Sequence, residues 1–188
     1  MNHMVHIDVG AILQASRKGV YTDLVTRATG RTVRTQIQER MAAGSPGTIA
    51  VIDFSRVGLL DFSCADEIVA TLMRQCCADA PGYDGYLLFA GINEGHLDAI
   101  EHVLERHRLA LVVRFSPLGG HRLVGVIDET ERVVWEAVVR LQRALPGDVA
   151  AETGLAPDDA DARLAMLHRR RLLMRDGMMY RAPIGAIA

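Results

Sequence analysis

Four carboxylates lie between positions 53 and 67 of the sequence: Asp53, Asp61, Asp66 and Glu67. Carboxylates in this density are the residue type that serves acid–base catalysis or Mg²⁺ binding. No base, nucleophile and set of oxyanion donors accompanies them in the sequence. Carboxylates at strand ends and helix starts more often cap helices or sit in solvated turns. We therefore expect no catalytic residues, no metal site and no enzymatic activity here.

Histidines and cysteines are the other residues with possible chemistry. His96, His102 and His107 fall on one predicted helix, where we expect them to face solvent or to be partly packed, with a proton relay as the alternative. Neither the histidines nor the three cysteines have the paired spacing of a zinc site. Cys76 and Cys77 are adjacent and the count is odd, which favours reduced thiols over disulfides. The sequence indicates neither metal nor cofactor.

Arginines are concentrated at the C-terminal end. Residues 128–161 hold nine acidic residues and three arginines, whereas residues 162–188 hold six arginines and one acid. A basic patch is the usual footprint of phosphate-backbone binding, although the net charge of −2 gives no overall attraction to nucleic acid. The six candidate DNA-contacting residues are Arg163, Arg169, Arg170, Arg171, Arg175 and Arg181.

Composition limits the class of protein. The 188 residues are 49% hydrophobic and 23% charged, which is typical of a soluble globular chain. No apolar run approaches the roughly 20 residues that a membrane-spanning helix needs. The N-terminus has neither a basic start nor a long apolar stretch, so it does not resemble a signal peptide. We expect a cytoplasmic protein without a membrane span.

Alternating apolar runs and helical periods predict an α/β fold with a central sheet in the first part of the chain. Thr29-Gly30 precedes a predicted helix in which Val33, Ile37 and Met41 recur every four residues. Asn93 is a candidate cap for a second helix, and Ser63 with Asp66 predicts a third helix start of the capping-box type. The predicted strands are Thr48–Phe54, Tyr86–Ala90, Leu109–Phe115 and Arg122–Ile127, the last two joined by a turn at Gly119-Gly120.

The segment IDFSRVGLLDFSCADEIV, Ile52 to Val69, resembles the strand, loop and helix start of STAS domains, and is closer still to the STAS-like family of unknown function. The similarity extends from about Tyr21 to Ile127. It implies an α/β domain that binds a protein partner. In signalling STAS proteins a serine directly after the loop aspartate accepts a phosphoryl group.

The sequence departs from that pattern at the regulatory loop. Asp61 is followed by Phe62, and the hydroxyl comes one residue later, at Ser63. Helix N-termini tolerate anions, so a phosphoryl group on Ser63 is one interpretation. A plain helix cap is the interpretation we favour, because N-cap serines are common without any switching role.

The remaining residues predict three helices and a hairpin. The first helix carries an apolar stripe from Val133 to Leu145, begins at Thr130 and Glu131, and ends before Pro146-Gly147. A short helix spans about Val149 to Thr153. A third opens at Pro157, and two strands follow around Asp176-Gly177.

This arrangement resembles a winged helix-turn-helix domain over about Thr130 to Pro183. Ala150 and Gly154 stand four apart, as in that motif. Arg171 departs from the pattern, because it occupies a place between the long helix and the wing where these domains often have glycine. A positive φ would strain an arginine there, so the junction is expected to differ.

The winged-helix resemblance implies that the helix Pro157–Arg170 enters the major groove and that wing arginines contact phosphates or the minor groove. One feature opposes this use. Asp158, Asp159 and Asp161 occupy the first turn, where they stabilise the helix dipole but repel phosphates.

We therefore expect two modules, a STAS-like domain over 1–127 and a winged helix over 130–188, joined by Asp128–Thr130. Such a short junction allows a change in one module to alter the other. The predicted function is a transcriptional regulator, as a homodimer that binds DNA. The alternative is a protein-interaction adaptor in a partner-switching pathway.

Overall fold

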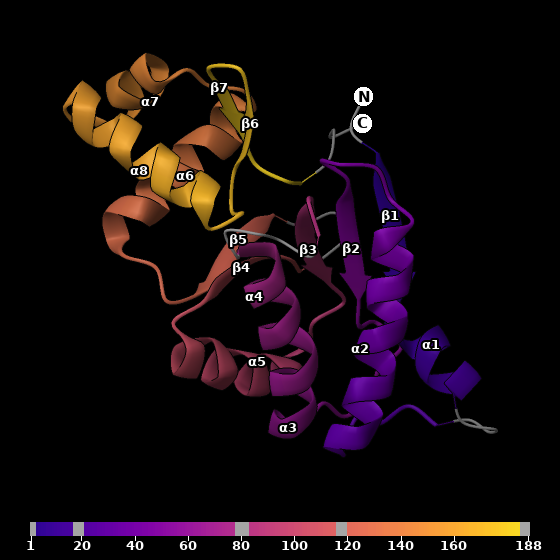
Figure 1. Ribbon diagram of the computed structural model, residues 1–188. Helices are drawn as coiled ribbons and strands as arrows, with labels where there is room; N and C mark the ends of the chain where they lie inside the picture. The colour runs from indigo at the N-terminus through magenta and orange to yellow at the C-terminus, as the bar shows by residue number, and fades with distance from the viewer. Residues whose placement is uncertain (1–2, 17–20, 78–82, 116–119, 185–188) are drawn as a thin grey trace. The chain divides into compact units, whose positions relative to one another are not determined.

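A five-stranded sheet forms the centre of the first part of the chain. Its strands lie side by side in chain order: β1 (Met4–Asp8), β2 (Ile49–Asp53), β3 (Tyr86–Ala90), β4 (Ala110–Arg114) and β5 (His121–Gly125). The first four are parallel, and β5 is antiparallel to β4. The predicted α/β fold with a central sheet is confirmed (Figure 1). β1 was not predicted from the sequence.

The computed structural model describes residues 3–16, 21–77, 83–115 and 120–184. It divides into two compact units, Met1–Val126 and Ile127–Ala188. Gly119 of the predicted turn lies outside the described residues. No helix in the described ranges has both the length and the apolar character needed to cross a bilayer.

Helices of the first unit connect its strands. They are α1 (Val9–Ser16), α2 (Arg27–Ala42), α3 (Phe62–Ala65), a π-helical turn (Asp66–Ala70), α4 (Thr71–Cys77) and α5 (Glu94–His107). Right-handed crossovers between parallel strands in chain order place the connecting helices on the same face. Figure 1 shows α2, α4 and α5 together in front of the sheet.

The start of α2 differs from its prediction. Thr26 caps the helix by accepting a hydrogen bond from the Thr29 backbone N–H, so Thr29 and Gly30 lie inside the first turns and are buried. A Cβ added at Gly30 would lie 3.2 Å from Cys64 Cα. Gly30 therefore lies within the helix, where it permits close packing between α2 and α3, and does not precede it.

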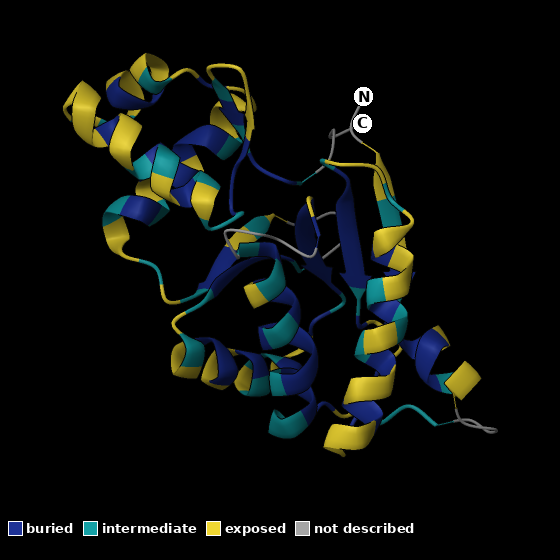
Figure 2. Ribbon diagram, viewed as in Figure 1, coloured by how far each residue is buried: buried dark blue, intermediate teal, exposed yellow. Residues whose placement is uncertain are grey.

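The core of the first unit lies between the sheet and these helices (Figure 2). Ile37 of α2, Ile52 of β2 and Phe89 of β3 are fully buried there. The predicted repeat of Val33, Ile37 and Met41 faces this core, as the four-residue spacing requires. Burial of both faces of β2 and β3 explains their almost continuous apolar sequence.

The second unit contains three helices and a two-stranded hairpin. The elements are α6 (Glu129–Leu141), α7 (Pro146–Thr153), α8 (Pro157–Arg169), β6 (Met174–Asp176) and β7 (Met179–Arg181). Trp135 of α6 is 2% exposed and donates a hydrogen bond from Nε1 to the Leu172 carbonyl at 3.1 Å. Leu164, Leu167 and Tyr180 are buried in the same unit.

Two predicted boundaries of α6 are wrong. The N-cap is Asp128, which accepts from the Glu131 backbone N–H, so the expected junction Asp128–Thr130 already belongs to the helix start. The helix ends at Leu141, and Leu145 precedes α7, whose first residue is Pro146. Between them, Ala144 pairs with Tyr180 of β7 through two backbone hydrogen bonds of 2.9 and 2.8 Å. An apolar stripe cannot reveal this break, because Leu145 is apolar although 40% exposed.

Candidate functional site

Asp61 organises the loop that precedes α3. Its carboxylate caps α3 by accepting a hydrogen bond from the Cys64 backbone N–H at 2.8 Å. The Ser63 hydroxyl donates to both Asp61 oxygens, at 2.9 and 3.1 Å. The prediction that Ser63 caps this helix is therefore wrong, because the helix begins at Phe62 and the carboxylate already satisfies the free N–H. Ser63 is instead held by Asp61.

Phe62, the residue after Asp61, packs on α5. Its ring lies edge-on to the His102 ring, with centroids 4.8 Å apart, and the Arg106 guanidinium lies 5.7 Å from its centroid. A short bridge between Leu24 and Leu60 supports the same loop. Val25 and Leu59, beside the bridge, are 39% and 61% exposed. The loop thus borders an exposed apolar surface.

Asp53 takes a separate role at the end of β2. Its Oδ1 accepts a hydrogen bond from the Ser55 backbone N–H at 2.8 Å, and its Oδ2 lies 3.1 Å from His6 Nε2. Gly91 approaches so closely that a Cβ there would lie 2.2 Å from Ser55 N. Through these contacts Asp53 stabilises the turn that follows β2. No group of three or more metal-ligating side chains occurs in the described ranges 3–16, 21–77, 83–115 and 120–184.

Asp66 and Glu67 form a network of ion pairs with α2 and α5. Arg27 contacts Asp66 at 3.1 Å and Glu67 at 3.3 Å, and His107 Nε2 lies 2.6 Å from Asp66 Oδ1. Glu67 is 7% exposed and is also contacted by Arg31 and Arg34, at 3.5 and 3.2 Å.

These contacts change the acidity of Asp66. Burial acts to raise the pKa of its carboxyl, but hydrogen bonds from His107 and Arg27 and their charges outweigh this effect and lower the pKa below its usual range. The carboxylate is therefore an ionised structural partner. Arg27, Arg31 and Arg34 were not predicted as site residues, although their spacing at i, i+4 and i+7 places them on one helix face.

The three histidines of α5 have different environments. His96 is 1% exposed; its backbone N–H donates to Asn93 Oδ1, and its Nε2 lies 2.9 Å from the Gly58 carbonyl oxygen. His102 is exposed against Phe62, and His107 pairs with Asp66. The expectation of solvent-facing or partly packed rings is therefore wrong for His96, whereas Asn93 is confirmed as the helix cap. The three histidines share no hydrogen-bonding partner, so they do not form a proton relay.

The cysteines are free thiols, as expected. Cys64 is buried, and its Sγ lies 3.0 Å from the Thr26 carbonyl oxygen. Burial, reinforced by the nearby Asp61 carboxylate, raises the pKa of Cys64 to about 12. The thiol therefore stays protonated and unreactive at neutral pH.

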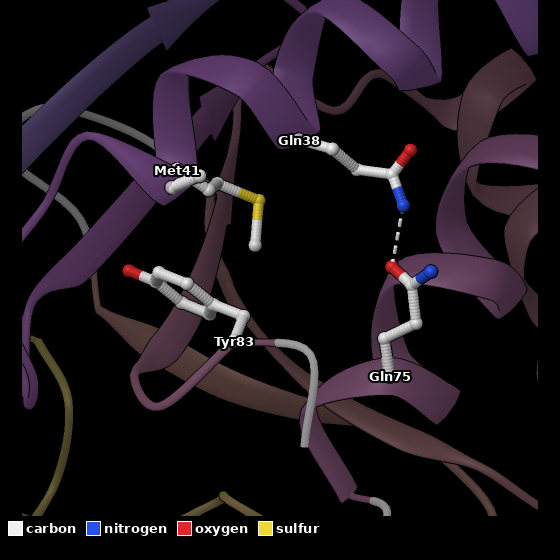
Figure 3. A pocket seen from close by; sticks show the side chains of 5 residues that line it. Gln38, Met41, Gln75 and Tyr83 are labelled. Carbon is white, nitrogen blue, oxygen red and sulfur yellow. Dashed lines mark hydrogen bonds between the residues drawn. The ribbon is translucent and has the colours of Figure 1, made fainter.

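A small cavity of about 80 Å³ lies in the first unit between α2, α4 and Tyr83 (Figure 3). Met41, Ala42 and the Tyr83 ring form its apolar wall. On the opposite side Gln38 Nε2 donates to Gln75 Oε1 at 2.7 Å. The Tyr83 hydroxyl donates to the Thr48 carbonyl at 2.9 Å, and burial raises its pKa to about 12. The cavity has room for several water molecules, and these lining residues are uncharged.

The six candidate arginines of the second unit do not form one surface. Arg163 pairs with Asp128 at 2.6 Å and Arg170 pairs with the buried Glu131 at 2.9 Å, so both hold the capping box of α6. Arg171 has a φ of 59°, so the junction takes the strained positive value that the sequence analysis expected it to avoid. Half-buried Arg181 ends β7.

Arg169 and Arg175 are the exposed members of that set. Arg169 lies at the end of α8, and its Nη2 approaches Met166 Sδ at 3.7 Å. Arg175 lies on β6, where its Nε donates to the Gly177 carbonyl and its guanidinium lies 5.5 Å from the Tyr180 ring centroid. Asp158, Asp159 and Asp161 are exposed at the opposite end of α8. The charge of this helix is therefore acidic at its start and basic at its end.

No protein-family model, curated protein or solved structure matches this chain.

Proposed function

We propose that the chain is a non-enzymatic regulatory protein in which a STAS-like interaction unit is joined to a winged helix that controls transcription. The observation that carries the proposal is the order of elements in the second unit. Ala144 pairs with β7 between α6 and α7, and the hairpin β6–β7 follows α8. A short strand after the first helix and a wing after the third is the topology expected of a winged helix.

The local geometry supports a helix-turn-helix within this unit. Gly154 ends α7 with a φ of 72°, and Ala150 is buried four residues earlier. Positive φ favours glycine at a helix end, because a side chain there would be strained. Pro157 is the first residue of α8. A backbone N–H at this position has no partner within the helix, so the N–H that proline lacks is not missed.

The charge distribution determines how such a unit would approach DNA. The acidic first turn of α8 opposes insertion of that end into the major groove. Arg169 and Arg175 offer their charges at the other end of α8 and on the wing. We therefore propose that phosphate contacts come from this basic end, in a homodimer that binds two half-sites.

Salt dependence of DNA binding tests the proposal. Affinity for promoter fragments from the protein's own genomic neighbourhood should fall steeply between 50 and 200 mM salt, by roughly tenfold or more if several arginines release counterions. Arg169→Ala and Arg175→Ala should each weaken binding at all salt concentrations. The matched control is Arg140→Ala, because exposed Arg140 is paired with Glu152 at 3.1 Å on another part of the unit. Equal affinity of all three variants, or no binding at low salt, contradicts DNA recognition by this surface.

A protein-interaction adaptor is the second candidate. The exposed apolar residues Val25 and Leu59 beside the Asp61 loop favour it, as does the acidic start of α8. Under this alternative, Leu59→Ser abolishes capture of a specific partner encoded in the genomic neighbourhood, while Arg169→Ala and Arg175→Ala leave that capture unchanged. Retained capture by Leu59→Ser contradicts the adaptor role of this surface.

A further inference from the structure

Three arginines on one face of α2 converge on a single buried carboxylate. Arg27, Arg31 and Arg34, here called the α2 arginine cluster, all lie within 3.5 Å of Glu67 oxygens. Each approaches through one nitrogen, so none forms the two parallel hydrogen bonds that arginine makes with carboxylates in its strongest pairs. Pairing with Glu67 therefore leaves part of the hydrogen-bonding capacity of this cluster unused.

The charges of the cluster do not cancel. Three guanidinium groups face two carboxylates, Asp66 and Glu67, and His107 adds a further ring that can carry a proton. The guanidinium groups remain charged at any physiological pH. An excess of at least one positive charge therefore remains where α2, α5 and the π-helical turn meet.

Unused hydrogen-bond donors accompany this charge. Among the residues that the structure describes, Arg31 pairs with Glu67 through Nε alone, and its side chain is 65% exposed, so its two Nη groups are available to a ligand. Arg34 Nε is buried and has no hydrogen-bond partner in the part of the chain that the structure describes. Buried donors in native proteins are almost always satisfied, by protein, by ordered water or by an ion. This unpaired donor shows that Glu67 does not use all the hydrogen-bonding capacity of the cluster.

We propose that the α2 arginine cluster binds the phosphate group of a small phosphate monoester. A phosphate offers three acceptor oxygens and about two negative charges, which match several N–H groups that approach from different side chains. The Nη groups of Arg31 supply a bidentate contact, and Arg27 and Arg34 add charge from the same helix face. The site belongs to the first unit alone and does not depend on DNA binding by the second unit.

Side-chain NMR of the full chain tests the site. Arginine Nε–Hε resonances are followed while inorganic phosphate, then phosphoserine, is added at constant ionic strength in a buffer without other oxyanions. Saturable shifts confined to Arg27, Arg31 and Arg34 are expected, with binding in the millimolar range or tighter. Chloride at matched ionic strength should produce no saturable shift. A response to phosphate but not to phosphoserine would contradict a monoester ligand.

Variants separate a specific site from general charge. Arg31→Gln should weaken phosphate binding by about tenfold, and Arg31→Lys, which keeps the charge but loses the planar fork, should weaken it by an intermediate factor. Arg40→Gln is the control, because this arginine lies on the same helix but bonds the Gln36 carbonyl. Equal binding by wild type, Arg31→Gln and Arg40→Gln would overturn the proposal. DNA affinity should be the same in wild type and Arg31→Gln, which keeps this test independent of the transcriptional role.

Discussion

At the scale of single residues, the bonding partner decides what each carboxylate does. Asp61 caps a helix, Asp53 fixes a turn, and Asp66 pairs with Arg27 and His107. Residues that looked like one acidic group in the sequence therefore occupy separate environments. An acid–base or Mg²⁺ site would require them to converge on one point.

Substitutions at Asp61 and Ser63 should distinguish the cap from the hydroxyl that it holds. Asp61→Ala should lower the free energy of unfolding by about 1 kcal/mol, because the Cys64 N–H loses its acceptor. Ser63→Ala should cost less, since Ser63 donates to Asp61 and caps nothing. Ser63→Glu should cost more than Ser63→Ala, because it adds a second carboxylate beside Asp61. Urea denaturation measures all three, and a larger loss for Ser63→Ala than for Asp61→Ala would reverse the assignment.

The lowered pKa of Asp66 predicts a specific pH dependence. A carboxyl whose pKa is lower in the folded state stabilises the protein above its unfolded pKa of about 3.9, and this contribution disappears as the pH falls through the folded value. Asp66→Asn should therefore reduce stability at pH 7, by roughly 1–2 kcal/mol, and the difference from wild type should shrink below about pH 4. Denaturation between pH 2.5 and 7 measures it, with exposed Asp98→Asn on α5 as control. A difference independent of pH would refute the ionised role.

At the scale of elements, helix ends determine where the strain lies. Arg108 follows the last residue of α5 with a left-handed φ of 54°, and β4 begins two residues later. Arg171 likewise has a positive φ, of 59°, before β6. A non-glycine residue in this region costs roughly 1–2 kcal/mol, so the packing that follows each helix must hold it there.

Glycine at the end of α5 should relieve this strain. Arg108 is exposed, so Arg108→Gly should raise the free energy of unfolding by up to about 1 kcal/mol after the entropy of glycine in the unfolded chain is subtracted. Arg108→Val should lower it, because a β-branched residue tolerates positive φ poorly. Thermal denaturation of both variants gives the comparison. Stabilisation by valine and not by glycine would show that φ is not the controlling factor.

At the scale of the whole molecule, the chain divides into two units, each with its own buried residues. The single tryptophan, Trp135, lies in the second unit, so its fluorescence reports unfolding there. Circular dichroism reports helices of both units. The two signals therefore allow the units to be followed separately.

Core substitutions should act on one unit at a time. Ile52→Val, in the first unit, should destabilise that unit by about 1 kcal/mol and leave the tryptophan transition unchanged. Leu164→Ala, in the second unit, should move the tryptophan transition by roughly 2–5 kcal/mol. Denaturant titrations followed by both probes test this. Equal displacement of both signals by Ile52→Val would mean that the chain unfolds as one cooperative unit.

The sequence by itself determined the elements whose pattern is local. Tyr86–Ala90 was predicted as a strand and is β3, and the Asn93 cap and the Pro157 helix start were also found from sequence. β1 was missed because only Ile7 of its five residues is buried, which leaves no apolar run to detect. Periodicity and capping chemistry are visible within a few neighbouring residues, and this is why such elements can be predicted.

Only the tertiary structure decided which charged residues meet. Arg27 and Asp66 are 39 positions apart, and Glu131 and Arg170 are also 39 apart, so nothing in their local sequence pairs them. Helix packing brings the α2 arginines onto Glu67 and takes Arg163 and Arg170 away from the basic surface that the sequence suggested. An ion pair depends on distance in space, and a linear sequence does not contain that distance.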